Sequence, residues 1–543
     1  MARPVRYSRS ELVGSSMVWL LRVDYASRSF LFSSAFIPAD QMPEDDDGRP
    51  YTLAGSLGDM PDISEAFDLL TTSSSSRSVS FRGIVFPVDI GAFIEAGHDL
   101  GAATGEVALW RIGDSYSDRL VWLTGRLSQP EYGAKGEPCA FSVEENPFDD
   151  MNEIPPADAR ASKHSLASVF GTGSVGKYYP TVFGTPGTYT TENKSAGAIP
   201  GTVAVIVDKS FVVGKGQSAD TLVIAGHRVA ETTAKIWSDS DTDETFTVSH
   251  IDDLLGNTLA TVDVSGASTI DRTAQEFFCT WDTGGIIGKN GAPVIGAGDL
   301  LERFLEQSSL RLDAGRIAMA KPALNAYKFS GYINQSAGPW EWVEANLLPL
   351  IPVSVVSGPG GIYPVVWKFD AIASDAIEII DADSGIAVRD GPVAYEVEPI
   401  DVRNNIRLDY ALNADDQEPR RFIVLRGDPD PDNPNEMGSY YAEVSYSRFG
   451  SAAATISSNI VYDDDTARAI LLWKIRAEGF LHRSITYTLP KSFAWLGLGD
   501  VVELTDSDLS ISARVALVQS IRWATEETIS ITLLVVDDPA RDI

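Results

Sequence analysis

The chain has 543 residues, and 43 Lys and Arg stand against 76 Asp and Glu, which gives a formal net charge of −33 at pH 7. Its apolar fraction of 44% is normal for packed cores, and at roughly 100–200 residues per domain the length indicates three or four domains. These values exclude a disordered acidic polymer. The excess of negative charge also disfavours general binding to nucleic acid or to anionic membranes.

The chain has only two cysteines, Cys139 and Cys279, which are too few for a disulfide framework and too far apart in sequence for a CxxC metal site. The N-terminal residues lack the continuous apolar region of a signal peptide, so we expect no export. The most apolar stretches, at 345–356 and 515–521, are shorter than the ~20 residues that a membrane span needs, so we expect no such span.

Residues 1–150 are predicted to form a small antiparallel β domain. Apolar and polar residues alternate with a period of two, as in half-buried strands, at 17–25, 29–37, 78–85, 106–112, 120–127 and 139–144. The run 61–70 begins with Pro and has acidic residues in its first turn, which predicts one helix in this domain.

Residues 151–285 are predicted to form a β-rich middle domain or insertion, with strands at 203–207, 221–224, 245–248 and 259–264. Residues 286–400 are predicted to form an α+β module, because 298–308 and 339–351 place apolar residues at helical spacing and strand patterns follow at 363–369 and 393–397.

Residues 401–543 are predicted to form a closing domain. Its strands are expected at 407–410, 422–425, 439–446, 485–489, 501–504, 514–521 and 529–536. The strongest helix of the chain is predicted over 466–481, because three Asp residues at 463–465 precede it and suit the positive end of a helix dipole.

Two parts of the chain resemble each other. The stretches 105–127 and 499–522 both read Gly, acid, Val, then a turn, then Arg and a long apolar-alternating strand. Gly105 and Arg119 are 14 residues apart, and Gly499 and Arg514 are 15 residues apart. The pattern indicates either two copies of one β-barrel, one near each end of the chain, or a chance similarity between two hairpins.

The motifs of catalysis are weak. The run Gly171-x4-Gly176-Lys177 spells most of a phosphate-binding loop, but Tyr178 stands where Ser or Thr is required and no helical pattern follows. There is no G-x-S-x-G motif, and no histidine pair has the spacing of metal ligands among His98, His164, His227, His250 and His482. We therefore predict a protein that is not an enzyme, although a carboxylate pair for glycoside cleavage stays open.

One acidic loop has the oxygen-rich chemistry that Ca²⁺ prefers. The run DPDPDNPNE at 428–436 offers a possible calcium site formed by Asp428, Asp430, Asp432 and Glu436. Three prolines make a stiff, solvated turn the alternative, and no other cofactor is expected. The run SDSDTDE at 238–244 is a weaker candidate for a metal. The eleven tryptophans could form a sugar-binding platform, but their strand and helix contexts favour a place in cores or subunit interfaces.

The order of motifs resembles the baseplate hub, or tail-tip hub, proteins of tailed bacteriophages and of related gene-transfer agents and contractile injection particles. The matching stretches are GEVALWRIG and RLVWLTGRLSQPEYG within 105–133, GKYYPTVFG at 176–184, GDLLERFLEQSSLRLD at 298–313, YKFSGYINQSAGPWEWVEANLLP at 327–349, RNNIRLDYAL at 403–412, DDTARAILLWKIRAEGFLHRSITYTLP at 464–490 and LGLGDVVELTD at 496–506. Residues 190–285 match no such motif, which suggests an insertion.

The resemblance implies a mainly β, multidomain fold with two similar small β-barrels, a β-rich insertion and a helical module. It implies a homotrimer whose barrels build a pseudo-sixfold ring, which adapts the sixfold tail tube to the threefold tip, closes the tail lumen and opens for DNA ejection. The implied partners are the distal tail protein, the tape-measure protein and tail-tip, fibre or receptor-binding proteins, while genomic DNA passes without specific binding.

The implied location is the tail tip or baseplate of a virion, after synthesis in the host cytoplasm. An acidic lumen would let DNA pass without adhering to it. The alternatives are a receptor- or carbohydrate-binding tail protein and a tail-associated cell-wall hydrolase.

Overall fold

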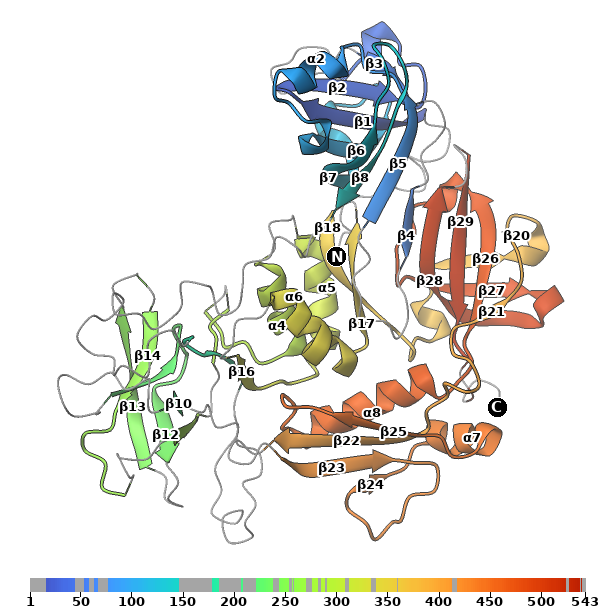
Figure 1. The fold of residues 1–543 in the computed structure, drawn as a ribbon. Helices are drawn as coiled ribbons and strands as arrows, with labels where there is room; N and C mark the ends of the chain where they lie inside the picture. The colour runs from blue at the N-terminus through green and yellow to red at the C-terminus, as the bar shows by residue number, and fades with distance from the viewer. Residues whose placement is uncertain are drawn as a thin grey trace.

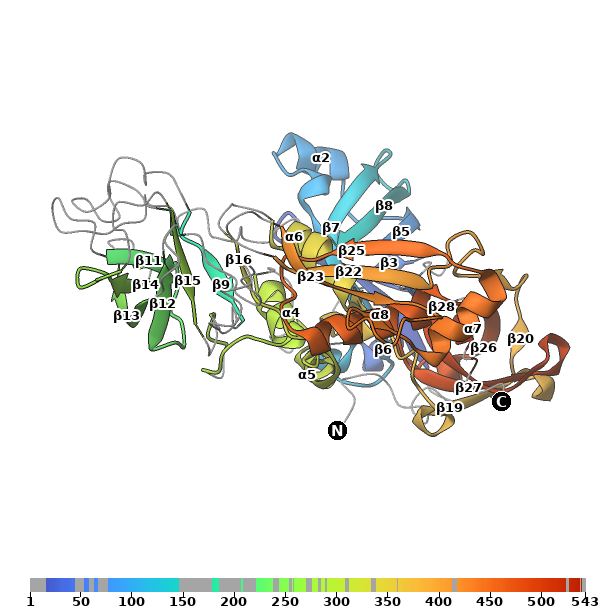
Figure 2. The same ribbon diagram turned by 90° about the horizontal axis from the view of Figure 1, so that it is seen from below.

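The computed structural model describes residues 16–43, 53–57, 63–66, 77–145, 178–184, 207–208, 221–237, 244–252, 256, 258–269, 276–281, 285–288, 291–307, 312–333, 338–358, 360–412, 418–523, 527–537 and 539. Strands dominate these residues, and they are grouped in several separate sheets, so the mainly β, multidomain fold class is confirmed. In both views the strands β10 to β15 stand apart at one end of the molecule (Figures 1 and 2).

The first part of the chain forms a curled sheet of seven strands, which we call the first curled sheet. Its strand order is β3 (Leu53–Ser56), β2 (Arg28–Ser33), β1 (Met17–Tyr25), β6 (Thr104–Arg111), β7 (Leu120–Glu131), β8 (Cys139–Glu145) and β5 (Arg77–Ile84). Both faces of β1 are buried, because Trp19 and Leu21 belong to the main core while Val18 and Leu20 belong to a smaller core on the opposite face. A short helix, α2 (Ile90–Glu95), follows β5 and is capped by the Asp89 side chain.

The last part of the chain forms the second curled sheet. Its strand order is β19 (Glu378–Asp381), β27 (Val501–Asp506), β28 (Ile511–Trp523), β29 (Thr528–Val535), β26 (Arg483–Pro490) and β20 (Val388–Arg389). Two short strands lie off this path, because β21 (Ala394–Tyr395) pairs with β26 and β4 (Ser64–Ala66) pairs with β28. The sheet therefore includes a piece of the N-terminal part of the chain.

The strand β4 corrects the prediction of a helix over 61–70. Residues 64–66 form an antiparallel ladder with Ser520, Ile521 and Arg522, and the N–H of Trp523 donates to the carbonyl of Ile63 at 3.0 Å. The Pro and the acidic residues are typical of a helix start, but pairing with a distant strand decides the conformation of such a short segment.

A six-stranded sheet in the middle of the chain has its own hydrophobic core. Its order is β10 (Val207–Asp208), β15 (Glu276–Thr280), β12 (Thr233–Trp237), β13 (Glu244–Asp252), β14 (Thr258–Asp263) and β11 (Thr221–Ala225). A two-stranded ladder of β9 (Thr181–Phe183) and β16 (Gly331–Ile333) lies beside it, and Val182 of β9 packs in its core. This middle β unit is thus tied to the helical module that follows in sequence.

The helical module consists of α4 (Ala297–Leu305), α5 (Ala314–Leu324) and α6 (Pro339–Trp342), which continues as a π-helical turn, Val343–Leu347, and a 3-10 turn, Leu348–Leu350. The helices predicted over 298–308 and 339–351 are confirmed. The hairpin of β17 (Val353–Gly358) and β18 (Gly361–Val366) follows them. The Asp313 side chain begins α5 by accepting the N–H of Arg316 at 3.0 Å.

A four-stranded sheet supports the last two helices. Its order is β24 (Glu436–Met437), β23 (Pro419–Leu425), β22 (Asn405–Leu412) and β25 (Ala453–Ser457). The helix α8 (Asp464–Glu478) confirms the prediction over 466–481, and Asp463 caps it by accepting the N–H of Thr466 at 3.0 Å. The predicted strand over 439–446 is wrong, because α7 (Tyr440–Phe449) occupies it and begins at a capping hydrogen bond from the Ala442 N–H to the Ser439 hydroxyl.

The proposed boundaries at 150, 285 and 400 stay predictions. Strand pairing crosses all three of them, since β4 pairs with β28, β9 pairs with β16 and β19 pairs with β27. None of the described helices has the length and apolar character needed to cross a membrane.

Candidate functional site

The two stretches that resemble each other in sequence form the same strand layout. Residues 105–127 lie in the antiparallel pair of β6 and β7, and residues 499–522 lie in the antiparallel pair of β27 and β28. In both sheets the second strand is unusually long and pairs on its other edge with a third antiparallel strand, β8 or β29. Each curled sheet is thus built on one three-stranded meander of the same order.

A cluster of three indoles joins the two curled sheets. Trp19 on β1 meets Trp122 on β7 edge to face at 5.6 Å, and it meets Trp523 at the end of β28 edge to face at 5.7 Å. All three rings are buried, with at most 5% of their surface exposed. Because β4 also pairs with β28 next to this cluster, the two sheets share both a hydrophobic contact and a backbone ladder.

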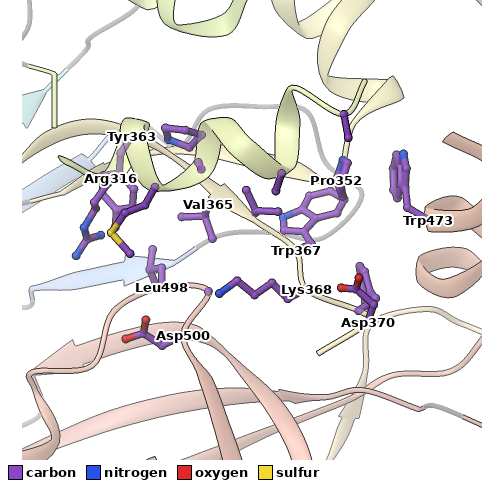
Figure 3. A pocket seen from close by; sticks show the side chains of 18 of the residues that line it. Arg316, Pro352, Tyr363, Val365, Trp367, Lys368, Asp370, Trp473, Leu498 and Asp500 are labelled. Atoms are coloured by element: carbon purple, nitrogen blue, oxygen red, sulfur yellow. The ribbon is translucent and has the colours of Figure 1, made fainter. Parts of the chain in front are cut away.

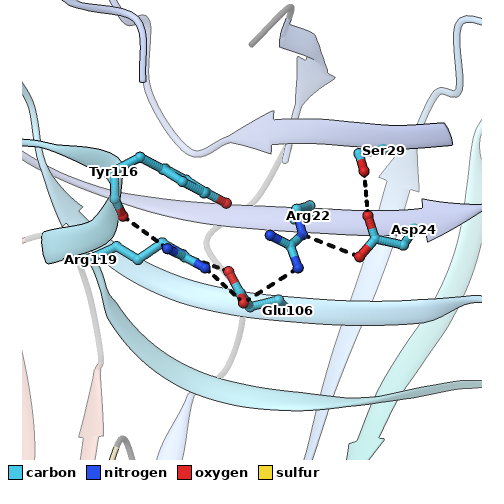
Figure 4. A network of polar contacts seen from close by, with 6 residues as sticks. All are labelled: Arg22, Asp24, Ser29, Glu106, Tyr116 and Arg119. Carbon is cyan, nitrogen blue, oxygen red and sulfur yellow. Dashed lines mark hydrogen bonds and ion pairs between the residues drawn. The ribbon is translucent and has the colours of Figure 1, made fainter. Parts of the chain in front are cut away.

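An ion-pair network fixes the start of β7 in the first curled sheet (Figure 4). Arg119 donates to both carboxylate oxygens of Glu106 at 2.7 and 3.0 Å, and Arg22 approaches the same carboxylate at 3.7 Å. Arg119 also donates to the carbonyl of Tyr116 at 2.9 Å and lies over its ring. Burial lowers the pKa of Arg119, but its hydrogen bond and ion pair with Glu106 outweigh that effect and raise the pKa, so the guanidinium stays charged.

A pocket of about 560 Å³ lies where the helical module meets the second curled sheet (Figure 3). Its walls come from α5, β18, α8 and the loop before β27, and they carry mostly apolar and aromatic side chains, among them Met319, Tyr363, Val365, Trp367, Trp473 and Leu498. The pocket therefore collects residues that are up to 184 positions apart in the sequence, from Arg316 to Asp500.

Hydrogen bonds hold the indoles of this pocket in place. Trp367 donates to the Ser354 hydroxyl at 3.0 Å, and Trp473 donates to the carbonyl of Leu350 at 3.0 Å. The two rings meet edge to face at 5.8 Å. Because both polar indole atoms are satisfied behind the wall, the surface facing the pocket is apolar.

Charged groups surround the apolar wall. Arg316 stacks on the Tyr363 ring at 4.0 Å, and Arg476 pairs with Asp370 at 3.9 Å. Lys368 is exposed and extends toward Leu498 (Figure 3). These cations make the rim locally less acidic than the chain as a whole.

The acidic and phenolic side chains that line the pocket have structural contacts or are protonated. The described lining residues include no Ser, Thr, Cys or His, and both acids have structural contacts, because Asp370 pairs with Arg476 and Asp500 accepts the N–H of Gly497 at 2.5 Å. Burial raises the pKa of the Tyr327 phenol, so this hydroxyl stays protonated.

The acidic loop at 428–436 lies between β23 and α7. Glu436 accepts the N–H of Asp430 at 2.8 Å and the side-chain amide of Asn433 at 3.2 Å, and it pairs with Arg426 at 3.3 Å. Asp430 in turn accepts the N–H of Asp432 at 3.0 Å. Within the described part of the chain, no group of three or more His, Cys, Asp or Glu side chains is arranged to hold a metal ion. The calcium site at Asp428, Asp430, Asp432 and Glu436 stays a prediction, and the hydrogen bonds of the turn give these side chains another use.

The other sequence candidates lie apart from one another. The run 171–177 and most of 238–244 fall outside the described residues. His227 and His250 lie in the middle β unit, where they accept the N–H groups of Val182 and Val229, and His482 is buried beside α8. Of the eleven tryptophans, nine are buried, and Trp342 and Trp495 are partly buried, which favours the core interpretation over a sugar platform.

Comparisons with known proteins return phage tail proteins. No family model and no curated protein matches the chain. Among solved structures, the chain is similar to the 43 kDa tail protein of prophage MuSo2 from Shewanella oneidensis, with 9% identity, 96% of this chain and 99% of that chain covered, and a TM-score of 0.33. It is also similar to the tail protein from Neisseria meningitidis MC58, with 10% identity, 96% and 97% coverage and a TM-score of 0.36. A chain of the virion of a native gene transfer agent has 13% identity, 59% and 78% coverage and a TM-score of 0.34.

Proposed function

We propose that this protein is the structural baseplate or tail-tip hub of a tailed phage or a related particle. The observation that carries the proposal is the pair of meanders, β6–β7–β8 and β27–β28–β29, which have the same order and lie in two sheets that are joined by the contact of Trp19 on β1 with Trp523 on β28. The ordered sequence motifs of hub proteins fall on β6 and β7, on β9, on the helical module, and on β22, α8, β26 and β27.

In this proposal three copies of the chain form one ring. Two similar sheets per copy provide six similar positions, so the ring can meet a sixfold tail tube on one side and a threefold tip on the other. The hub closes the lumen and opens for DNA ejection. Its neighbours are the distal tail protein, the end of the tape-measure protein and the tail-tip, fibre or receptor-binding proteins.

The net charge of −33 supports one further part of the proposal. Carboxylates that face the lumen repel phosphates and let DNA pass without binding. A channel wall that is neutral or basic in the assembled ring contradicts the proposed acidic lumen but does not contradict the proposed hub function.

The test combines two measurements. Light scattering on the purified chain gives the number of copies, for which we expect three, and electron microscopy of particles labelled with an antibody against the chain gives its location, for which we expect the tail tip. A chain that stays monomeric and is absent from the tip would falsify the hub. Binding of the isolated chain to cell surfaces favours the receptor-binding alternative, and clearing in a zymogram favours the hydrolase alternative.

The calcium site is a separate proposal with its own test. Ca²⁺ that binds the folded chain but not the unfolded chain raises the melting temperature of the protein, and Glu436→Gln should remove that shift. No shift in the unmodified chain contradicts the site.

A further inference from the structure

The segment 372–400 forms a strap along the second curled sheet. It begins beside β27, where the N–H of Ile377 donates to the carbonyl of Val501 at 2.9 Å and β19 runs parallel to β27. It then passes to β26, where β20 and β21 pair at the other end of the strand order. One continuous segment thus covers both ends of the curled sheet.

The strap has an inner and an outer face. Ile380, Ala387 and Val397 point into the core and have at most 5% of their surface exposed. The intervening large apolar side chains are exposed by 42% to 81%, namely Ile372, Ile377, Ile379, Ile386, Val388, Tyr395 and Ile400. These are seven of the fourteen large apolar residues that are exposed in the described chain.

The strap exposes an unusual amount of apolar surface. Half of the exposed large apolar side chains of the described chain lie on this one segment, and exposed apolar side chains that gather on one part of a surface mark interaction sites. The strand β19 also ends the strand order of the second curled sheet, so within the described residues its outer backbone edge pairs with no further strand.

We infer that the outer face of the strap is an interface with a second copy of this chain. The inference rests on the proposed ring of three and names the surface that forms it. Permanent interfaces between copies are more apolar than transient ones, and the strap combines isoleucines with an open strand edge. In both views β20 lies on the side of the second curled sheet that is away from the helical module, where a neighbouring copy has access (Figures 1 and 2).

The charge of the strap decides how the copies meet. Residues 372–400 contain seven acidic side chains and one Arg, and that Arg389 lies 3.8 Å from Asp506 of its own sheet. A twofold contact of strap on strap would bring the acidic groups of both copies together, which is unfavourable. The strap therefore contacts a different surface of the next copy, and such head-to-tail contacts close into rings.

The first test measures the number of copies in a double variant, Ile379→Glu with Val388→Glu. Both side chains point outward, with 60% and 62% of their surface exposed, so the fold should persist and circular dichroism should be unchanged. We expect light scattering to show a shift from three copies to one. The matched control is Phe36→Glu with Tyr446→Glu, at exposed positions away from the strap, which should remain trimeric.

The outcomes separate the inference from the proposed function. If the unmodified chain is a monomer, the trimeric hub itself is wrong. If the unmodified chain is trimeric and the folded strap variant is also trimeric, the hub stands and the strap interface is wrong.

A labelling experiment tests the same surface without adding charge. Because Cys139 and Cys279 are both buried, a single Tyr395→Cys variant presents one accessible thiol. We expect its reaction with a thiol reagent to be at least tenfold slower in the trimer than in the Ile379→Glu, Val388→Glu background, whereas a Phe36→Cys thiol reacts equally fast in both. Equal rates at residue 395 in the two backgrounds contradict the inference.

Discussion

The indole of Trp523 lies edge to face against the indole of Trp19 at 5.7 Å, although 504 positions separate the two residues in the sequence. This contact connects the last long strand of the second curled sheet to the first strand of the first curled sheet. A chain that places two similar sheets at fixed positions in a ring needs such a rigid junction between them.

Removing the ring at 523 should weaken this junction. Trp523→Ala removes a buried indole, and we expect a loss of about 3–5 kcal/mol in the free energy of unfolding, measured by urea denaturation. Trp523→Phe keeps an aromatic contact with Trp19 and should cost less than half as much. A double-mutant cycle of Trp523→Ala with Trp19→Leu should give a coupling of about 0.5–1.5 kcal/mol, and a coupling near zero contradicts the role of the pair.

The ion pair of Glu106 and Arg119 should contribute far more than an exposed pair. Both side chains are largely buried, so Glu106→Gln leaves the Arg119 charge without its partner, and we expect a loss of about 2–4 kcal/mol in the free energy of unfolding. The control is the pair of Arg407 and Asp409, which has the same 2.7 Å separation but a half-exposed Arg407. A double-mutant cycle of Arg407 and Asp409 should give a coupling free energy of less than about 1 kcal/mol. An equal coupling in the corresponding cycle of Glu106 and Arg119 contradicts the prediction.

Local patterns predicted most of the strands and the main helices, because alternation and capping residues act within a few positions. The helix α8 shows this, since Asp463 and the apolar spacing after it are both readable in the sequence. The helix α7 was missed because its fully buried positions carry only small residues, Ala442 and Ser445, while Tyr440 and Tyr446 are exposed and imitate a strand pattern. The capping residue Ser439 was the signal that could have identified it.

Contacts between distant segments set what local patterns could not predict. The three residues of β4 are extended because β28 offers a free edge to them, and their own sequence favours a helix start. The pocket near Trp367 and the strap have the same origin. Each combines side chains from several elements, and only the packing of those elements decides which apolar residues are buried and which stay exposed.

The side chain of Asn404 should be essential for the closing part of the chain. This fully buried amide donates to the carbonyl of Gly450 at 2.8 Å and to the Ser445 hydroxyl at 3.1 Å, and it accepts the N–H of Ala452 at 2.8 Å. Asn404→Leu removes these hydrogen bonds from the Gly450 carbonyl and the Ala452 N–H, and we expect a loss of about 3 kcal/mol in the free energy of unfolding, measured by urea denaturation.

The neighbouring residue provides the control for Asn404. Asn405 is only partly buried, and its side chain has one long hydrogen bond of 3.5 Å to Ser451, so Asn405→Leu should change the stability by less than about 0.5 kcal/mol. Similar losses in the two variants contradict the assignment of the network to Asn404. The Asn404 side chain also gives the polar start of the motif RNNIRLDYAL a structural role. Its amide connects the residue before β22 to Gly450 at the end of α7.

Protonation of His227 at acid pH should destabilise the middle β unit. Its Nε2 accepts the N–H of Val182 at 3.0 Å, so the ring must be neutral there, and its Nδ1–H donates to the carbonyl of Arg228. Burial, together with smaller contributions from the charges of Arg303 and His250, lowers the pKa of His227 from 6.5 to about 4. Because the folded pKa lies below the unfolded one, the stabilisation is complete above pH 6.5 and is lost as the pH falls from 6.5 toward 4.

Amide hydrogen exchange at Val182 measures this effect directly. Between pH 7 and pH 5.5 we expect a loss of about 1 kcal/mol in the opening free energy, after correction for the intrinsic rate, because the ring is only partly shielded from solvent. His227→Gln supplies an acceptor that does not titrate, so the loss in this variant should be smaller by about that amount. The remaining acid dependence then belongs to other groups, including His250 and His482, whose pKa values burial also lowers. An unchanged pH dependence in His227→Gln contradicts the assignment to His227.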